Sequence, residues 1–172
     1  PGFLTMLVAR DDGTVVSASP LRAQDGSSVL AKLTRVDDRP YFIVPMRDRT
    51  TYVSEVFVGR GFGADPIVAI SAPIEDAAGR TSGIVEGSLD VRALQALGPS
   101  AKGAPEVDYV IVDRQDRVIF SSLTPPLPPL ASIGDGPLVR AARVDQGAGF
   151  FTYQADAPAG DRPDTRLAAR CS

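Results

Sequence analysis

The 172-residue chain contains no histidine and no tryptophan, and it has a single cysteine, Cys171. Without histidine, the sequence lacks the commonest general base and the commonest metal ligand. A lone cysteine excludes a disulfide within the chain and argues against a zinc site. We therefore expect no metal, no cofactor, and no enzyme that acts through a Ser-His or Cys-His pair.

Long apolar runs and a strong charge of either sign are also missing. Runs such as residues 66–74 (PIVAISAPI) are too short to cross a bilayer as a helix. The net charge of −3 gives no electrostatic reason to expect nucleic acid or anionic lipid as a partner. The chain begins at Pro1 and shows no signal peptide, so we expect a piece of a longer protein.

The composition that remains is that of an ordinary globular protein, with 44% apolar and 23% charged residues. Sixteen glycines and fifteen prolines predict many turns and few helices. Alternation and turn residues predict the following elements: hairpins at 3–19 and 107–122, strands at 51–59, 65–76, 149–155 and 165–171, a short helix within 26–36, an extended segment at 41–46, and a strand passing into a helix over 81–97.

The two predicted hairpins resemble each other. Residues 6–19 (MLVARDDGTVVSAS) and 110–122 (VIVDRQDRVIFSS) both give an apolar strand, an Arg-x-Asp turn, an apolar strand and terminal serines. This repetition predicts two related α+β modules in tandem, at residues 1–100 and 101–172. The Gly- and Pro-containing stretch at 98–105 would link them, and the second module would be cut short.

One motif resembles a dinucleotide-binding motif, but the residues that follow it do not suit such a site. Residues 59–64 (GRGFGA) match the dinucleotide fingerprint G-x-G-x-x-A after a predicted strand. That fingerprint needs a helix directly behind it, because the helix N-terminus binds the pyrophosphate. Here Asp65-Pro66 and a β-rich run follow, so a hairpin connection is the preferred interpretation.

Three further pieces, taken in order, resemble the double Cache (dCache) family of extracytoplasmic sensor domains. They are DRPYF at 38–42, TYVSEVF at 51–57 with PIVAISAPIEDAAGRTSGIVEGSLDVRAL at 66–94, and the hairpin at 109–122. The resemblance covers nearly the whole chain, although the family's long N-terminal helix is missing. It implies an α+β fold of two PAS-like modules, each an antiparallel sheet with packed helices, of which the membrane-distal one at 1–100 binds the ligand.

The same resemblance nominates a first group of site residues. Arg39 stands where the family has its carboxylate-binding arginine, and a guanidinium fork binds a carboxylate bidentately. Tyr41 and Phe42 occupy the aromatic slots beside it, where Tyr41 can wall a pocket and donate its hydroxyl. The alternatives are a surface ion pair of Arg39 with Asp37 or Asp38, and a core position for the aromatics.

A second group lies farther along the chain. Tyr52 matches a family tyrosine, and Ser54 stands where amino-acid-binding relatives have an ammonium-binding Asp. Asp90 matches the family's late Asp, although it can equally be the N-cap of the following helix. Ser71, on the strand between them, can add a hydroxyl. The serine at position 54 counts against an amino-acid ligand, whereas a pocket-lining Asp90 would make an amine possible again.

The resemblance implies a sensor that is not itself an enzyme. The parent would be a membrane receptor (a histidine kinase of a two-component system, a chemoreceptor or a cyclic-dinucleotide enzyme), and this fragment would be its periplasmic, ligand-binding part. We expect a small carboxylate or amino-acid-like metabolite as ligand, a homodimeric parent, and membrane contact only through flanking helices. The alternative is a ligand-free module for dimerisation or protein interaction.

Overall fold

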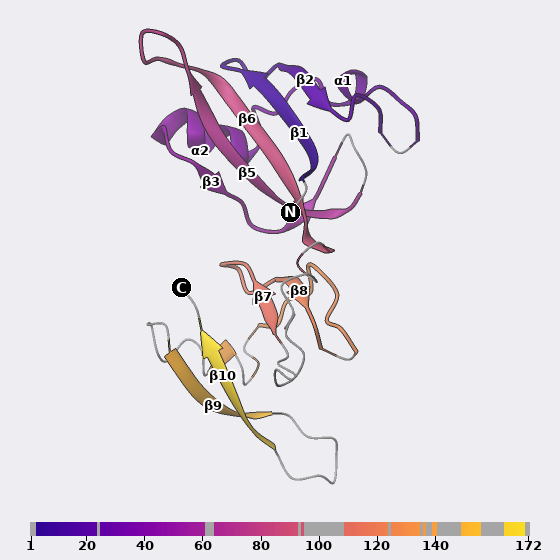
Figure 1. The fold of residues 1–172 in the computed structure, drawn as a ribbon, viewed down its shortest axis with the longest axis vertical. Helices are drawn as coiled ribbons and strands as arrows, with labels where there is room; N and C mark the ends of the chain where they lie inside the picture. Colours follow the sequence, from indigo (N-terminus) through magenta and orange to yellow (C-terminus); the bar gives the residue numbers. More distant parts are fainter. Residues whose placement is uncertain are drawn as a thin grey trace, which may run out of the picture. The chain divides into compact units, whose positions relative to one another are not determined.

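The fold is described from a computed structural model of the chain (Figure 1). The structure describes the following residues: 3–23, 25–60, 64–92, 94, 109–123, 125–134, 136, 139–140, 149–155 and 164–170. The chain divides into two compact units, Pro1–Ala131 and Ser132–Ser172. The predicted module boundary at 100/101 and the predicted linker at 98–105 lie outside the described residues, as does Cys171, so the two predicted modules stay a prediction.

The first unit is built on an antiparallel sheet of strand order β2-β1-β6-β5-β3, in which β4 also pairs with β5. Its strands are β1 (Phe3–Arg10), β2 (Val15–Ser19), β3 (Tyr52–Val53), β4 (Phe57–Val58), β5 (Pro66–Glu75) and β6 (Thr81–Asp90). Figure 1 shows β1, β6 and β5 running side by side through the middle of this sheet. Strand β5 begins at Pro66, two residues after the motif at 59–64 ends, so a strand stands where a dinucleotide site needs a helix.

Tight turns fix the predicted hairpins. In the β1–β2 turn, Gly13 adopts φ +81°, a left-handed conformation that glycine enters without strain. A Cβ at Gly13 would also lie 2.6 Å from Cβ of Asp37, so only glycine fits. The side chain of Asp12 accepts a hydrogen bond from the N–H of Thr14 (2.8 Å).

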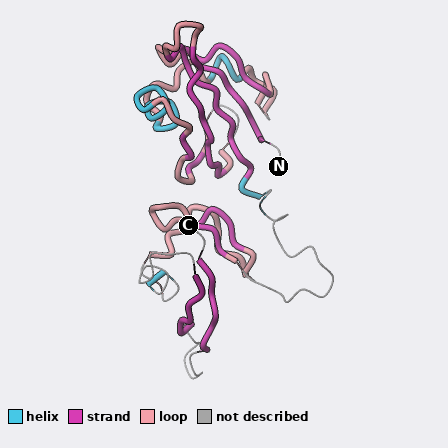
Figure 2. Tube along the Cα trace, turned by 60° about the vertical axis from the view of Figure 1, so that its left-hand side comes forward, coloured by secondary structure: helices cyan, strands magenta, loops and turns pink. Residues whose placement is uncertain are grey.

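Helices α1 (Val29–Lys32) and α2 (Pro40–Asp48) pack on one face of this sheet, as Figure 2 shows from a second direction. Their buried side chains share one core with those of the sheet. The core residues are Leu7, Ala9, Val15, Ala18, Val29, Leu33, Val36, Tyr41, Phe42, Ala69 and Ile84. The predicted helix within 26–36 thus forms, but it is only one turn long.

The extended segment predicted at 41–46 is wrong, because α2 occupies these residues. Pro40 begins the helix, where its fixed φ suits the first position and its missing N–H is not needed. Arg49 ends it in a left-handed conformation (φ 56°). Pro45 removes one hydrogen bond inside the helix but is itself buried. A six-residue apolar run does not distinguish a strand from a short helix.

The strand predicted at 51–59 is interrupted. Residues 54–56 separate β3 from β4, and Ser54 bridges the gap to β5. The N–H of Ser54 donates to the carbonyl of Ala69 (2.9 Å), and the N–H of Ala69 donates to the hydroxyl oxygen of Ser54 (2.9 Å). The serine side chain therefore replaces a backbone carbonyl in the ladder.

A second hairpin, β7 (Val110–Val112) and β8 (Val118–Ser121), belongs to the same compact unit. Ile119 packs against a small core formed by Val56, Val68 and Val91. The buried carboxylate of Asp113, in the turn of this hairpin, accepts a hydrogen bond from the N–H of Val56 (3.2 Å). The hairpin thus docks onto the segment that interrupts β3 and β4.

The second unit contains an antiparallel pair, β9 (Gly149–Ala155) and β10 (Asp164–Arg170). Both strands were predicted, with β10 beginning one residue earlier than expected. The α+β class with mainly antiparallel strands is thereby confirmed. Among the described residues, no helix is both long and apolar enough to span a membrane.

Candidate functional site

A cavity of about 180 Å³ opens on the helix-covered face of the first unit. Its floor is the sheet, with Leu7 from β1 and Glu86 and Ser88 from β6. Its opposite wall contains Arg39 and Tyr41 at the start of α2. An engineered cavity of about 150 Å³ holds benzene, so this cavity admits a compact metabolite.

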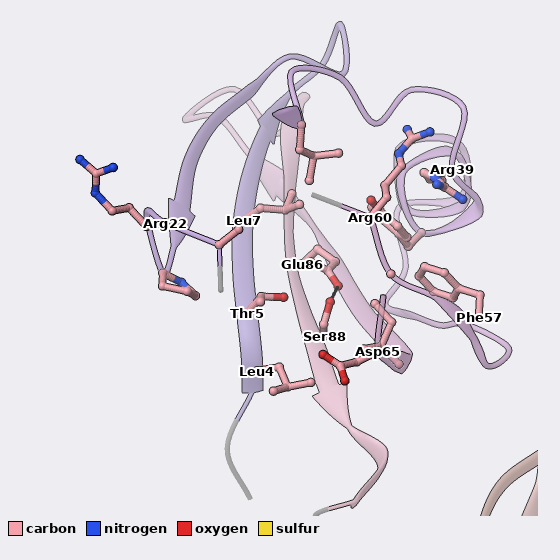
Figure 3. Close-up of a pocket in the computed structure, with 16 residues that line it drawn as sticks. Leu4, Thr5, Leu7, Arg22, Arg39, Phe57, Arg60, Asp65, Glu86 and Ser88 are labelled. Atoms are coloured by element: carbon pink, nitrogen blue, oxygen red, sulfur yellow. Dashed lines mark hydrogen bonds between the residues drawn. The ribbon is translucent and has the colours of Figure 1, made fainter. Parts of the chain in front are cut away.

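Figure 3 shows how the polar side chains are distributed. Glu86 lies between Thr5 and Leu7 on one side and Arg39, Arg60 and Phe57 on the other. The side chain of Arg22 points away from this group. The cavity thus combines an acidic floor with a basic and aromatic wall.

The strand register explains why Glu86 is on the floor. Residues directly opposite each other on antiparallel strands place their side chains on the same face. Glu86 is opposite Leu7 on β1 and opposite Ser71 on β5, and Ser71 is opposite Tyr52 on β3. Because Leu7 belongs to the core beneath the helices, Glu86 and Ser71 face that side as well.

Glu86 is a buried acid, with 2% of its surface exposed. The hydroxyl of Ser88 donates a hydrogen bond to Oε1 of Glu86 (2.8 Å). Burial raises the pKa of Glu86 to about 7, while the Ser88 hydrogen bond lowers it by a smaller amount. Near neutral pH this carboxyl can therefore exist in either protonation state.

Arg39 is held at the cavity but is not saturated by its neighbours. Its Nε is buried and donates no hydrogen bond within the described structure, and its ion pair with Asp38 is long, at 3.9 Å. Asp38 is bound instead by Arg60, through bonds of 2.6 and 3.1 Å. The guanidinium of Arg39 lies over the ring of Phe57, 5.9 Å from its centroid. This leaves Arg39 with donor capacity for an anion.

Tyr41 completes the wall. It is 6% exposed, and its ring stacks on Phe57 with a centroid distance of 6.1 Å. Burial, and next the charge of Glu86, raise the pKa of Tyr41 above its ordinary value of 10.0. The phenol therefore stays neutral and keeps its proton at physiological pH.

The structure brings together only some of the predicted site residues. Arg39 and Tyr41 line the cavity, whereas Phe42 is buried in the core of the sheet and helices. Ser71 is 1% exposed and its hydroxyl has no hydrogen-bond partner within the described structure, but it does not line the cavity.

The remaining candidates serve the fold in this structure. Tyr52 packs against the core, and the hydroxyl of Ser54 is used by the backbone of Ala69 and Glu55. Asp90 accepts hydrogen bonds from N and Nε of Arg92 (both 2.9 Å), as the N-cap alternative implies. None of the three lines the cavity, and their ligand-binding role stays a prediction.

Sequence reasoning missed the acid at the centre of the site. Glu86 is the single charged residue between apolar and small residues in IVEGSL (84–89), and alternation puts it in phase with the buried Ile84. This alternation is a sequence signal for a buried acid, whereas the family resemblance points to Asp90 on the same strand. Phe57, Arg60 and Asp65 were also missed as cavity-lining residues.

Within the described ranges, no group of three or more His, Cys, Asp or Glu side chains is arranged to hold a metal ion. The polar groups that line the cavity (three guanidiniums, a phenol, two carboxyls and two hydroxyls) are suited to holding a small polar molecule.

Comparisons with known proteins agree with this geometry at the level of the fold. No family model and no curated protein matches the chain. Solved structures do match: the ligand-binding domain of the Campylobacter jejuni chemoreceptor Tlp3 in complex with L-valine has a TM-score of 0.63 at 17% identity, and the match covers 97% of this chain and 61% of that one.

Two further structures give the same result. The ligand-binding domain of the Pseudomonas aeruginosa PAO1 amino acid chemoreceptor PctB, in complex with L-Arg, has a TM-score of 0.60 at 17% identity, covering 96% of this chain and 58% of that one. The extracellular domain of rpHK1S-Z16, a protein assigned as a histidine kinase, has a TM-score of 0.67 at 16% identity, covering 95% and 63%.

The chain has the fold of a bacterial receptor sensor domain. The resemblance to the dCache family that the sequence indicated therefore holds for the fold. The chain spans about three fifths of the length of the sensor domains it matches.

Proposed function

We propose that this chain is the ligand-sensing part of a bacterial membrane receptor and binds a small carboxylate or amino-acid-like metabolite in the cavity of its first unit. The observation that carries the proposal is Arg39: a side chain that lines a cavity and is 26% exposed, with a buried Nε that lacks a hydrogen-bond partner among the described residues. A buried polar group without a partner is unfavourable, and a ligand carboxylate would satisfy it with charge-assisted hydrogen bonds.

The surroundings of Arg39 support a ligand over a structural role. The alternative was a surface ion pair, but Asp37 is bound by Arg35 (2.9 and 3.0 Å) and Asp38 is bound by Arg60. Both nearby acids are thus occupied by other arginines. Stacked aromatic rings beside the guanidinium provide an apolar wall for the body of a metabolite.

The neighbours support the same class of ligand. Tlp3 and PctB were each solved with an amino acid, and both are chemoreceptors. We further propose that the chain lies in the periplasm, as part of a homodimeric receptor whose output is a chemotaxis, histidine-kinase or cyclic-dinucleotide signal. The chemoreceptor and histidine kinase domains among the neighbours support a receptor of this class. Neighbouring structures are sensory and ligand-binding domains, which supports a sensor rather than an enzyme.

A thermal-shift screen of the purified domain tests the proposal. The probes are the twenty proteinogenic L-amino acids and their 2-hydroxy acid counterparts. Because a ligand that binds only the native state stabilises it, at least one acid is expected to raise Tm in a concentration-dependent manner. Arg39→Ala should abolish this rise. Arg39→Lys should also lose most of it, since an ammonium cannot bind a carboxylate bidentately.

Arg80→Ala is the matched control, because Arg80 lies in the exposed β5–β6 turn and pairs only locally with Asp76. It should shift Tm in the presence of ligand as the wild type does. Equal shifts for the wild type and Arg39→Ala, or no shift with any acid of either series, would count against the proposed function.

A second candidate, an interaction module, is favoured by one observation. Met6 and Val53 lie in one row of the sheet, on the face away from the helices, and both are large exposed apolar residues. Phe3, which packs over Gly87 in that row, is exposed as well. Such a face is typical of a contact surface. Sedimentation of the wild type and of Met6→Glu would show whether this face supports self-association.

A further inference from the structure

We propose that Glu86 binds an ammonium group of the ligand, and that binding releases a proton from Glu86 to the solvent. This inference rests on the proposed function of the cavity and adds a second recognition element to it. Arg39 would hold the carboxylate end of the ligand and Glu86 the amine end, so the ligand would be a compact zwitterion.

The position of Glu86 is the first reason. It lies in the middle of β6, a central strand, with Leu7 opposite it on one side and Ser71 on the other. Burying a carboxylate there costs free energy that an apolar side chain would not cost. Glu86 forms an ion pair with no Arg or Lys in the part of the chain that the structure describes. An acid that lies at a cavity, is buried at a cost in folding free energy and has no countercharge is characteristic of a binding site.

The hydrogen-bonding capacity around Glu86 is the second reason. Ser88 donates its single hydroxyl proton to Oε1 of Glu86, so its oxygen remains available only as an acceptor. An ionised carboxylate is likewise an acceptor only. The floor of the cavity therefore offers acceptors side by side, and an ammonium with its three N–H donors complements them.

The charges that face Glu86 determine when it ionises. The groups around it are Tyr41 and Arg39 from α2 and its N-cap, Arg60 and Asp65 from the β4–β5 connection, Thr5 from β1, and Ser88 on its own strand. Arg60 is neutralised by Asp38, and Tyr41 stays uncharged.

The largest effect on Glu86 is therefore desolvation, which raises its pKa to about 7. In the empty cavity, a substantial fraction of molecules carry a protonated Glu86 at neutral pH. An ammonium placed beside the carboxylate stabilises the ionised form, so the proton leaves to solvent as the ligand binds. No covalent bond changes, and the ligand keeps its own three ammonium protons.

Isothermal titration calorimetry of the wild-type domain tests this inference with matched pairs of ligands: each L-amino acid that scores in the screen and its 2-hydroxy acid counterpart. The amino acid should bind at least tenfold more tightly than the hydroxy acid, which lacks the ammonium. Below pH 7, amino-acid affinity should fall by up to about tenfold per pH unit, because one proton must be released. Measurements in phosphate and in ACES buffer, which differ in their enthalpy of protonation, should give different apparent enthalpies at pH 6.5.

Glu86→Gln removes the titrating group while keeping the shape of the side chain. This variant should lose the preference for the amino acid, the pH dependence and the buffer dependence together. Glu75→Gln, at the exposed end of β5, should behave as the wild type. Urea unfolding of both variants would establish that they are folded.

Two results would overturn the inference. One is equal affinity of the wild type for the amino acid and the hydroxy acid. The other is tighter binding as the pH falls, which would mean that protonated Glu86 donates to a second carboxylate. Either result leaves the role of Arg39 intact, whereas a lack of binding by every acid of both series would reject the proposed function and this inference with it.

Discussion

At the scale of single residues, the site depends on how three arginines are distributed among two acids. Arg35 binds Asp37 and Arg60 binds Asp38, so Arg39 is left with only a 3.9 Å contact to Asp38. Exposed ion pairs of this kind contribute little stability. Their consequence here is electrostatic, since they keep both acids from neutralising the guanidinium at the cavity.

Ser54 shows that a predicted site residue can be structural in this fold. Ser54→Ala would leave the buried N–H of Ala69 without its acceptor, so we expect a loss of about 1–3 kcal/mol in the free energy of unfolding. Urea denaturation measures this loss, with Ser17→Ala on the exposed side of β2 as the control. The affinity of Ser54→Ala for the ligand should be unchanged. A loss of affinity without a loss of stability would instead indicate that Ser54 binds the ligand.

At the scale of elements, the hairpin β7–β8 is attached to the first sheet through the segment that interrupts β3 and β4. The carboxylate of Asp113 accepts from the N–H of Val56, from the N–H groups of Gln115 and Arg117, and from Nε of Arg117. Nearby, Arg114 pairs with Glu55 (2.6 Å) on the surface. Asp113 therefore stabilises both the turn and the contact with the first sheet, whereas the Arg114–Glu55 pair stabilises only that contact.

The contacts of Asp113 and the Arg114–Glu55 pair should therefore contribute differently to the free energy of unfolding. Asp113→Ala leaves several donors unsatisfied in a buried place and should destabilise the protein by about 2–4 kcal/mol. Arg114→Ala removes a pair whose arginine side chain is exposed, and it should cost less than about 1 kcal/mol. Hydrogen exchange at Val56 and along β8 would detect the difference. Similar protection in both variants would contradict this assignment of roles.

The elements differ in how far the sequence alone could predict them. The hairpins were predictable because their turns are local: Asp-Gly at 12–13 and the Asp-containing turn at 113–116 act within a few residues. Helix α2 was not, because an apolar run of six residues suits a strand as well as a helix, and packing against β5 and β6 decides.

The site was predictable only in part for the same reason. Arg39 and Tyr41 followed from a short motif, since both lie within three residues of one helix start. Glu86 depends on the register of β6 against β1 and β5, which involves residues up to 79 positions away. The alternation of residues 51–59 predicts one continuous strand through Ser54. It does not reveal that the strand is interrupted at 54–56, which is what gives the Ser54 hydroxyl a backbone partner.

At the scale of the whole molecule, Glu86 should make folding stability depend on pH. Its folded pKa of about 7 lies above its ordinary value of 4.5, so the native state binds more protons than the unfolded state between these two values. Stability should therefore fall as the pH rises from about 4.5 to 7 and then level off. The total loss is on the order of 3 kcal/mol.

Urea unfolding of the wild type and of Glu86→Gln at pH 5 and pH 8 checks this expectation. The free energy of unfolding of the wild type minus that of Glu86→Gln should be smaller at pH 8 than at pH 5. Taking this difference cancels the effect of the titratable groups that both proteins share. Parallel pH profiles would show that Glu86 ionises in the folded state as it does in water. An amino-acid ligand should stabilise the wild type at pH 8 more than it stabilises Glu86→Gln.

The central claim concerns Arg39, and a structure of the domain bound to the acid that raises Tm most in the screen tests it most directly. We predict that the ligand carboxylate lies in the cavity of the first unit and accepts two parallel hydrogen bonds of about 2.7–2.9 Å from the Arg39 guanidinium. A ligand bound elsewhere, or one in this cavity whose carboxylate does not contact Arg39, would contradict the account.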